Sequence, residues 1–203
     1  MEGFKRNKYY LNEILDQNSN ILFLFVQEHW LPDYEAKNKF SKAFQSYEFL
    51  TTSSDTFYHP EETLFQNGPV WHGSAIGWPR SINIYVQKLP IVCERFCGVK
   101  YMDPDKSINI VSYSVYLPTS GLDDEFGEII SLLSLDISQN QDESSTLIIG
   151  MDSNQGNKST QSRTFIMNNF LERFCLKTTH VNDVPTFHHN NNISSSQIDH
   201  IYI

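Results

Sequence analysis

The chain has 203 residues, of which 39% are hydrophobic, and its formal net charge at pH 7 is −9. This length suits one globular domain with a sizeable core, and the acidic balance argues against a broad basic face for non-specific nucleic-acid binding. A local basic groove, or a metal beside clustered carboxylates, remains compatible with that charge. The sequence has no signal peptide and no apolar run of membrane-spanning length. We therefore expect an intracellular protein, nuclear or cytoplasmic, with no membrane contact.

The three cysteines, Cys93, Cys97 and Cys175, are odd in number and form no Cys-x-x-Cys motif. Cys93 and Cys97 lie in a stretch that we predict to be a strand, where their spacing is too long for a disulfide. We expect all three to be reduced and to serve mostly as packing residues.

The first part of the chain is predicted to alternate helices with short strands. Residues 3–16 have the periodicity of an amphipathic helix, and residues 34–44 indicate a shorter one. Residues 21–26 are all apolar and predict a strand buried on both faces. We expect another short strand at 49–52 and an irregular polar segment at 53–69.

Glu28 directly follows the apolar strand, in the sequence Gln27-Glu28-His29-Trp30. An unpaired carboxylate is costly to bury, so Glu28 is either exposed or paired with a cation, and we favour the cation. His29 could assist as a ligand, but one histidine beside a tryptophan is more often a satisfied surface residue.

The middle of the chain indicates a series of strands. Residues 71–78 are rich in small side chains and predict a strand that another backbone approaches closely. Four further strands, the first three forming a meander, are expected at 81–86, 91–96, 99–102 and 108–117.

Tyr116 lies near the end of the last of these strands. Pro118 and Gly121 stop the strand and leave Tyr116 close to its exposed end. From this stretch alone, an amphipathic residue at the edge of the core is an equally good interpretation.

Two helices are expected in the second half of the chain. Residues 122–138 predict an amphipathic helix with acidic residues in its first turn, where the helix dipole favours anions. Its predicted buried stripe consists of Phe126, Ile129, Ile130, Leu133 and Ile137. Residues 164–175 predict the second helix, and short strands are expected at 176–180 and 186–188.

Residues 147–154 join an apolar run to the pattern Gly-x-Asp-x-Asn. Leu147 to Ile149 predict a buried strand, and Gly150 is expected to begin the turn out of it. Asp152 and Asn154 lie two residues apart, so in extended backbone their side chains point the same way. A carboxylate beside an amide suits a divalent cation and a phosphate oxygen. Taken alone, the stretch is more often a polar turn after a core strand.

The C-terminal residues combine a hairpin signal with another carboxylate. Residues 188–192, two histidines and three asparagines, have the composition of a solvated hairpin tip. Adjacent strand residues point to opposite faces, which argues against a metal-binding tract there. Residues 198–203 predict a last strand, in which Asp199 needs a partner among apolar neighbours.

Five motifs follow one another along the chain: QExW at 27–30, WHGSAIGW at 71–78, SVYLPTSG at 114–121, IIGMDSN at 148–154 and SSSQIDHI at 194–201. Together they resemble the endonuclease/exonuclease/phosphatase superfamily. Within it they are most similar to the endonuclease domain of non-LTR (LINE-type) retrotransposon polyproteins. Each motif is weak alone, but five motifs in the right order are a strong signal. The resemblance covers nearly the whole chain. The resemblance implies an α/β, DNase I-like fold: a four-layer sandwich of two mixed β-sheets flanked by helices, in one domain over residues 1–203.

The resemblance also implies Mg²⁺- or Mn²⁺-dependent hydrolysis of DNA phosphodiester bonds. Glu28 corresponds to the metal-binding glutamate, and Asp152, also expected at the metal, to the aspartate that orients or deprotonates the attacking water. Asn154 corresponds to the asparagine that positions this group and the phosphate. Tyr116 matches the tyrosine at the scissile phosphate, and Asp199 the aspartate that orients the catalytic histidine.

DNA contacts are implied for His188, His189 and Ser196. The family's first-strand asparagine would precede Met1 and its final Ser-Asp-His would follow Ile203, so we expect a domain truncated at both ends that lacks the first and last strands. We further expect a reverse transcriptase domain after it in the parent polyprotein.

Three functions remain open from the sequence. The first is an active endonuclease that nicks a target DNA strand, and the second is a catalytically inactive remnant or fragment of such a domain. The third is a phosphodiesterase or phosphatase of the same superfamily that acts on inositol phosphates or lipids. Because family residues are missing at both ends, we expect the chain as written to nick DNA poorly or not at all.

Overall fold

The computed structural model of the chain describes residues 2–18, 20–53, 73–119, 121–154, 160–179, 187–188, 195–196 and 199–203. The irregular segment predicted at 53–69 lies, apart from its first residue, outside these ranges, as does His189. No described helix is long and apolar enough to cross a membrane.

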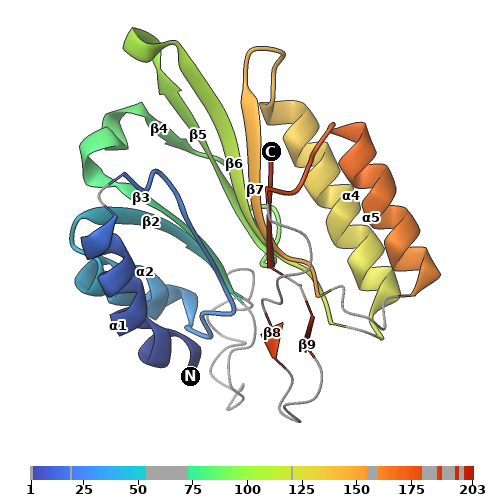
Figure 1. The fold of residues 1–203 in the computed structure, drawn as a ribbon, viewed down its shortest axis with the longest axis horizontal. Coiled ribbons are helices and arrows are strands. Elements are labelled where there is room, and N and C mark those ends of the chain that lie inside the picture. Colours follow the sequence, from blue (N-terminus) through green and yellow to red (C-terminus); the bar gives the residue numbers. More distant parts are fainter. Residues whose placement is uncertain are drawn as a thin grey trace.

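Two β-sheets form the centre of the fold (Figure 1). The small sheet has the order β1-β3-β2, with antiparallel strands Leu24–Gln27, Ser74–Pro79 and Tyr47–Thr52. The large sheet has the order β10-β7-β6-β5-β4, with strands Asp199–Tyr202, Thr146–Asp152, Ile108–Tyr116, Phe96–Asp103 and Val86–Lys88. Within the large sheet β6 and β7 pair in parallel, and the other described pairs are antiparallel.

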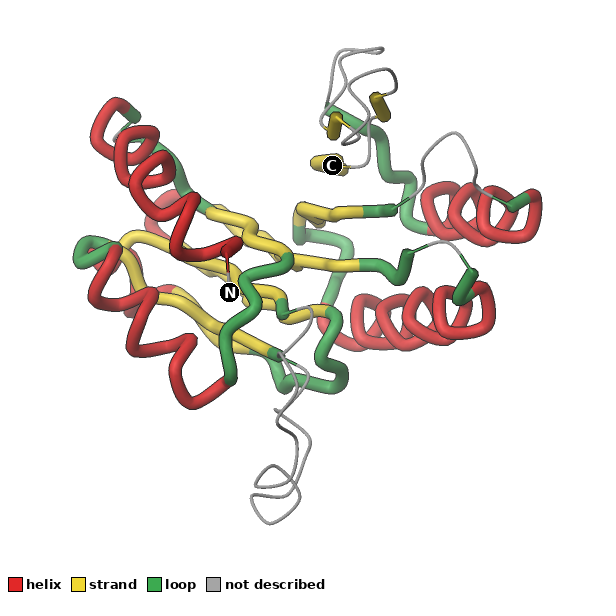
Figure 2. Tube along the Cα trace, turned by 90° about the horizontal axis from the view of Figure 1, so that it is seen from below, coloured by secondary structure: helices red, strands yellow, loops and turns green. Residues whose placement is uncertain are grey.

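Helices cover the outer face of each sheet (Figures 1 and 2). Helices α1 (Glu2–Gln17) and α2 (Asp33–Ala43) pack on the small sheet, where their apolar side chains share one core with β1 and β2. Helices α4 (Asp123–Asn140) and α5 (Gln161–Arg173) pack on the large sheet. A third apolar cluster, from β3 and β5, fills the space between the sheets. The predicted α/β sandwich of two sheets flanked by helices is therefore confirmed.

The amphipathic pattern predicted for α4 is also confirmed. All five residues of the predicted stripe are buried, in one cluster with the apolar side chains of β6 and β7. Each such side chain contributes roughly 1.5–3 kcal/mol by leaving water. This burial presses α4 against the large sheet along its whole length.

Two predicted strands, at 81–86 and 91–96, are wrong, and the strand predicted at 176–180 is reduced, over its described residues, to an isolated bridge between Thr178 and Tyr202. Residues Arg80–Tyr85 form a 3₁₀ helix in the stretch where the chain crosses from β3 of the small sheet to β4 of the large one. Residues 91–95 form a turn closed by the isolated bridge between Cys93 and Phe96. Pro90 has no backbone donor with which to continue a ladder.

Glycines let side chains from one strand fit against another. A Cβ added to Gly77 would lie 2.4 Å from a ring carbon of Phe49. At Gly77, therefore, an aromatic ring approaches β3 closely, and not another backbone as the sequence predicted. Gly150 does not begin a turn, because β7 continues through it to Asp152. Its missing side chain makes room for Phe25 of β1 between the two sheets.

No disulfide joins the three cysteines. Cys93 and Cys97 are buried, as a packing role requires, but Cys175 is exposed just after α5, so the packing prediction is wrong for Cys175. Its backbone has a φ of 54°, which turns the chain out of the helix.

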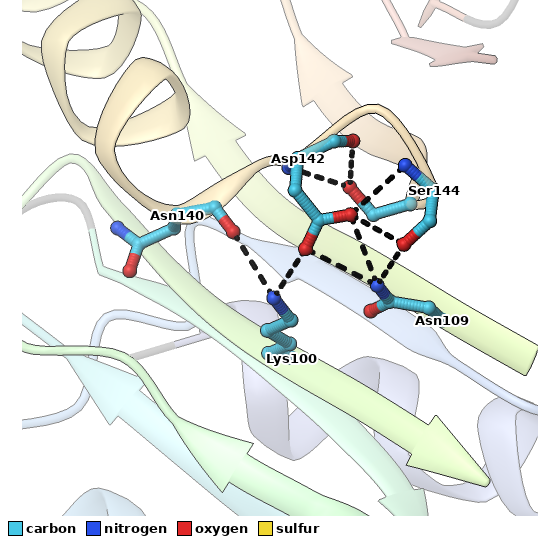
Figure 3. A network of polar contacts seen from close by, with 6 residues as sticks. Lys100, Asn109, Asn140, Asp142 and Ser144 are labelled. Atoms are coloured by element: carbon cyan, nitrogen blue, oxygen red, sulfur yellow. Dashed lines mark hydrogen bonds and ion pairs between the residues drawn. The ribbon is translucent and has the colours of Figure 1, made fainter. Parts of the chain in front are cut away.

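A polar network fixes the turn that leads into β7 (Figure 3). Asp142 accepts hydrogen bonds from Lys100 of β5 at 3.0 Å and from Asn109 of β6 at 3.3 Å. The Ser144 hydroxyl and then Lys100 hold the pKa of the Asp142 carboxyl well below its usual range. This network lies next to the pairing of Ile110 with Thr146, and the same register places Tyr116 beside Asp152 at the other end.

Candidate active site

The parallel pairing of β6 and β7 brings two predicted site residues together. Because parallel strands end at the same edge of a sheet, Tyr116 and Asp152 are register partners at the lower ends of β6 and β7 in Figure 1. The antiparallel strand β10 begins at this edge and pairs Asp199 with Asp152. Three of the predicted residues thus lie side by side on adjacent strands.

Glu28 joins this group from the small sheet. The Tyr116 hydroxyl donates a hydrogen bond to Glu28 Oε1 at 2.7 Å. Burial, and then the Glu28 carboxylate, raise the pKa of Tyr116, so its phenol stays protonated and acts as a donor. The guanidinium of Arg95 lies 5.3 Å from the centre of the Tyr116 ring and pairs with Glu125. Tyr116 is thus contacted both at its ring, by Arg95, and at its hydroxyl, by Glu28.

Asp152 is only 7% exposed and has negatively charged neighbours. Burial, then the charges of Asp199 and Glu28, raise the pKa of Asp152 to about 7, although the backbone N–H of Asn154 opposes this shift. A carboxyl group with a pKa near neutral exchanges protons readily at pH 7, which is the property of a general base. The site therefore concentrates negative charge around one titratable group.

Asn154 lies at the site in a conformation that the sequence did not indicate. Its φ is 48°, in the left-handed region, so Asp152 and Asn154 do not present their side chains as neighbours in an extended strand. Instead, the Asn154 backbone N–H donates to Asp152 Oδ1 at 3.1 Å, and its Nδ2 donates to the Leu117 carbonyl at 2.7 Å. Asn154 thereby links the end of β7 to the loop that follows Tyr116.

Gln27 fixes the distance between the two sheets at the site. From β1 its Nε2 donates to Ser114 Oγ of β6 and to the Gly150 carbonyl of β7, both at 3.1 Å. Ser74 of β3 adds a hydrogen bond to Ser114 Oγ at 2.9 Å. Since Gln27 immediately precedes Glu28, this bridge positions Glu28 opposite Tyr116.

His29 is a buried structural residue, which corrects the expectation of a surface position. It is 1% exposed, and its Nδ1 accepts from the Leu31 backbone N–H at 3.1 Å. The ring proton therefore sits on Nε2, which donates to the Thr52 carbonyl at 3.0 Å. With both ring nitrogens engaged, His29 is a poor candidate for a metal ligand.

Two buried arginines near the site were not predicted. Arg95 stands in the turn before β5, where no local pattern marks it. Arg163 shares a face of α5 with Met167 and Phe170, both buried. The three residues are four and three positions apart, a helical spacing from which the inward position of Arg163 could have been predicted.

The hairpin predicted around residues 188–192 has its two strands in place. Strands β8 (Phe187–His188) and β9 (Ser195–Ser196) pair antiparallel, with His188 opposite Ser195. In Figure 1 they lie below the start of β10, at the same end of the sheets as the site. DNA contacts by His188, His189 and Ser196 stay a prediction.

The architecture is that of an α/β sandwich of the DNase I type, with helices outside two facing sheets. No protein-family model matches the sequence, and no curated protein matches it. Solved structures do match. The endonuclease domain of TRAS1, a telomere-specific non-LTR retrotransposon, aligns at 15% identity and a TM-score of 0.65, over 96% of this chain and 78% of that one.

Enzymes with other named activities share this architecture. The AP endonuclease LMAP from Leishmania major aligns at 14% identity and a TM-score of 0.68, over 98% of this chain and 74% of that one. A mannosyl-6-phosphatase from Bacteroides thetaiotaomicron aligns at 13% identity and a TM-score of 0.64, over 99% of this chain and 77% of that one. The chain thus has the endonuclease/exonuclease/phosphatase fold.

Proposed function

We propose that this chain is a single endonuclease domain of the non-LTR retrotransposon type, which hydrolyses phosphodiester bonds in DNA with the help of Mg²⁺ or Mn²⁺. The observation that carries this proposal is the meeting of Tyr116 and Glu28 across the two sheets, beside the paired Asp152 and Asp199. Clustered carboxylates can supply a general base for in-line attack on a phosphate, and a neutral phenol and an amide can donate hydrogen bonds to its oxygens.

The donor chemistry of the site suits a hard divalent cation. Among the residues that the structure describes, no three His, Cys, Asp or Glu side chains form a complete metal-binding group. Mg²⁺ needs only one or two protein carboxylates, because waters and substrate phosphate oxygens complete its shell. Glu28 and Asp152 would hold the ion, which would offset the charge that raises the pKa of Asp152. When bound, the ion polarises a phosphate oxygen.

The residues of the chain have separate tasks in this proposal. Asp152 orients the attacking water and accepts its proton. Burial and the neighbouring Asp199 raise the pKa of Asp152, which counteracts the lowering that a bound ion would cause. Once Glu28 binds the ion, the Tyr116 phenol would turn its single proton from Glu28 Oε1 to a phosphate oxygen, where negative charge develops. Asn154 holds the loop after Tyr116 through the Leu117 carbonyl.

DNA is the favoured substrate because the fold is shared with an AP endonuclease and a retrotransposon endonuclease domain. By the same proposal, a reverse transcriptase follows the domain in its parent polyprotein, and the protein acts inside the cell. An alternative is hydrolysis of phosphomonoesters. It is supported by the similarity to the mannosyl-6-phosphatase, whose TM-score is nearly equal to that of the TRAS1 endonuclease domain.

The test is nicking of supercoiled plasmid in Mg²⁺ by the wild type, Asp152→Ala, Glu28→Gln and Asp142→Ala. Asp142→Ala is the matched control, because Asp142 lies at the opposite end of β7. The sequence predicts that the wild type nicks weakly; whatever Mg²⁺-dependent nicking it shows should be lost in the first two variants and kept in the control. Release of phosphate from phosphomonoesters without nicking would favour the alternative, and no hydrolysis of either substrate would indicate a non-catalytic domain.

A further inference from the structure

The loop between β6 and α4, residues 117–119, is attached to the candidate site on one side. The Leu117 backbone N–H donates to the Asp152 carbonyl at 2.9 Å, and the Leu117 carbonyl accepts from Asn154 Nδ2 at 2.7 Å. Any displacement of this loop therefore moves the partner of the Asn154 amide, directly next to Tyr116.

Arg163 of α5 holds the same loop from the other side. Its Nη1 donates to the Pro118 carbonyl at 2.9 Å and its Nη2 to the Thr119 carbonyl at 2.6 Å. Its Nε donates to Asp123 Oδ1 at 2.6 Å, and Asp123 Oδ2 accepts from the Thr160 hydroxyl at 2.9 Å. One guanidinium thus connects the loop, the start of α4 and the start of α5.

The planar guanidinium suits this task better than a lysine would. Its donors form a rigid fork, so two consecutive carbonyls bound to it are fixed relative to each other. Arg163 also lies over the Phe126 ring, with 4.7 Å from the guanidinium carbon to the ring centre. Because Arg163 is only 1% exposed, it is shielded from a bound substrate and acts through the loop.

We propose that Arg163 is a positioning residue of the candidate active site. By fixing the Pro118 and Thr119 carbonyls, it keeps Leu117 where Asn154 binds it and keeps the end of β6, with Tyr116, in register. Asp123 orients the guanidinium. The consequence for catalysis rests on the proposed function, but the positioning of Asn154 does not.

The positioning is tested first without reference to activity. The side-chain amide signals of Asn154 are identified in a ¹⁵N NMR spectrum by their absence in Asn154→Asp. We expect Arg163→Met and Arg163→Lys to shift these signals and to speed their exchange with solvent. Arg173→Met is the matched control, since Arg173 is also on α5 and lies over the Phe174 ring but contacts Ser138 instead of the loop.

Asp123→Asn is a second variant in case Arg163→Met fails to fold, because it keeps the guanidinium and weakens the hydrogen bonds that Asp123 accepts from Arg163 and Thr160. Unchanged Asn154 signals in Asp123→Asn and Arg163→Lys, together with lower melting temperatures, would overturn the proposal and leave Arg163 a purely stabilising residue.

Kinetics then tests the consequence. For DNA cleavage in Mg²⁺, Arg163→Lys should lower kcat by about tenfold or more with little change in KM, since small displacements of reacting groups reduce rates strongly. In an Asn154→Ala background the same substitution should have a much smaller effect, because both changes disturb one unit. Additive losses would overturn the coupling. Shifted Asn154 signals in a protein that cleaves nothing would refute the proposed function and leave the positioning intact.

Discussion

Gly150→Ala should destabilise the protein by forcing the two sheets apart. The new Cβ would lie 2.1 Å from Phe25 Cγ and 2.5 Å from Phe25 Cβ. Both atoms are at the base of the side chain, so a small rotation of the ring does not remove the overlap. Either Phe25 takes another rotamer or β1 moves away from β7.

The size of the effect follows from two opposing contributions. Overpacking of a core typically costs about 1–3 kcal/mol, and we expect the upper end because the contact is so short. Replacing glycine by alanine within a strand returns roughly 0.5–1 kcal/mol of backbone entropy. The net loss is about 2 kcal/mol, which lowers the melting temperature by roughly 4–8 °C in a chain of this size.

Gly127→Ala provides the matched control for calorimetric unfolding. Gly127 lies within α4, and the nearest atom to its new Cβ is Ile166 Cδ1 at 3.7 Å, an ordinary contact. Alanine is favoured over glycine in a helix by about 1 kcal/mol, so this variant should melt at a higher temperature. A Gly150→Ala protein as stable as the wild type would show that the sheets do not pack as described.

Three further predictions concern polar groups. Burial raises the pKa of Asp136, so the stability that its protonated form contributes is complete below the unfolded pKa of about 4 and is lost as pH rises through the folded pKa. Melting temperatures of Asp136→Asn should therefore fall less with rising pH than those of the wild type, with the part of the decline that is due to Asp152 remaining. Gln27→Leu should lower the free energy of unfolding in urea by about 1–3 kcal/mol, because Ser114 and the Gly150 carbonyl lose a donor, whereas Gln87→Leu on exposed β4 should have little effect. Mg²⁺ should raise the melting temperature of the wild type but not of Asp152→Asn, and equal shifts would argue against an ion at Asp152.

Elements whose signal is local were predictable from the sequence. The stripe of α4 repeats at helical spacing, and β6 and β7 are apolar runs with clear ends, so their existence and faces followed directly. The 3₁₀ helix Arg80–Tyr85 was not predictable, because its form depends on the crossing between the two sheets. Gly150 was misinterpreted for a related reason. A side chain is missing there because Phe25 occupies the space, and Phe25 lies on a strand far away in the sequence.

The gathering of the candidate site residues followed from polar side chains at the ends of apolar strands. The contacts between the residues of the candidate site could not be predicted from the sequence. The left-handed backbone of Asn154 and the bond from Tyr116 to Glu28 depend on tertiary packing, and the loop contacts of Arg163 join residues more than forty positions apart. A single sequence carries no information on such pairs beyond a helical spacing that turns Arg163 inward.

Glu28 and Trp30 have φ angles of 53°, so each holds a conformation that residues with a side chain rarely adopt. Such positions are maintained by their surroundings at a cost of order 1–3 kcal/mol, which glycine would remove. Replacement of Glu28 by glycine would therefore relax the backbone while deleting the carboxylate. Both positions thus keep a side chain at a cost to the stability of the fold, as strained positions at functional sites commonly do.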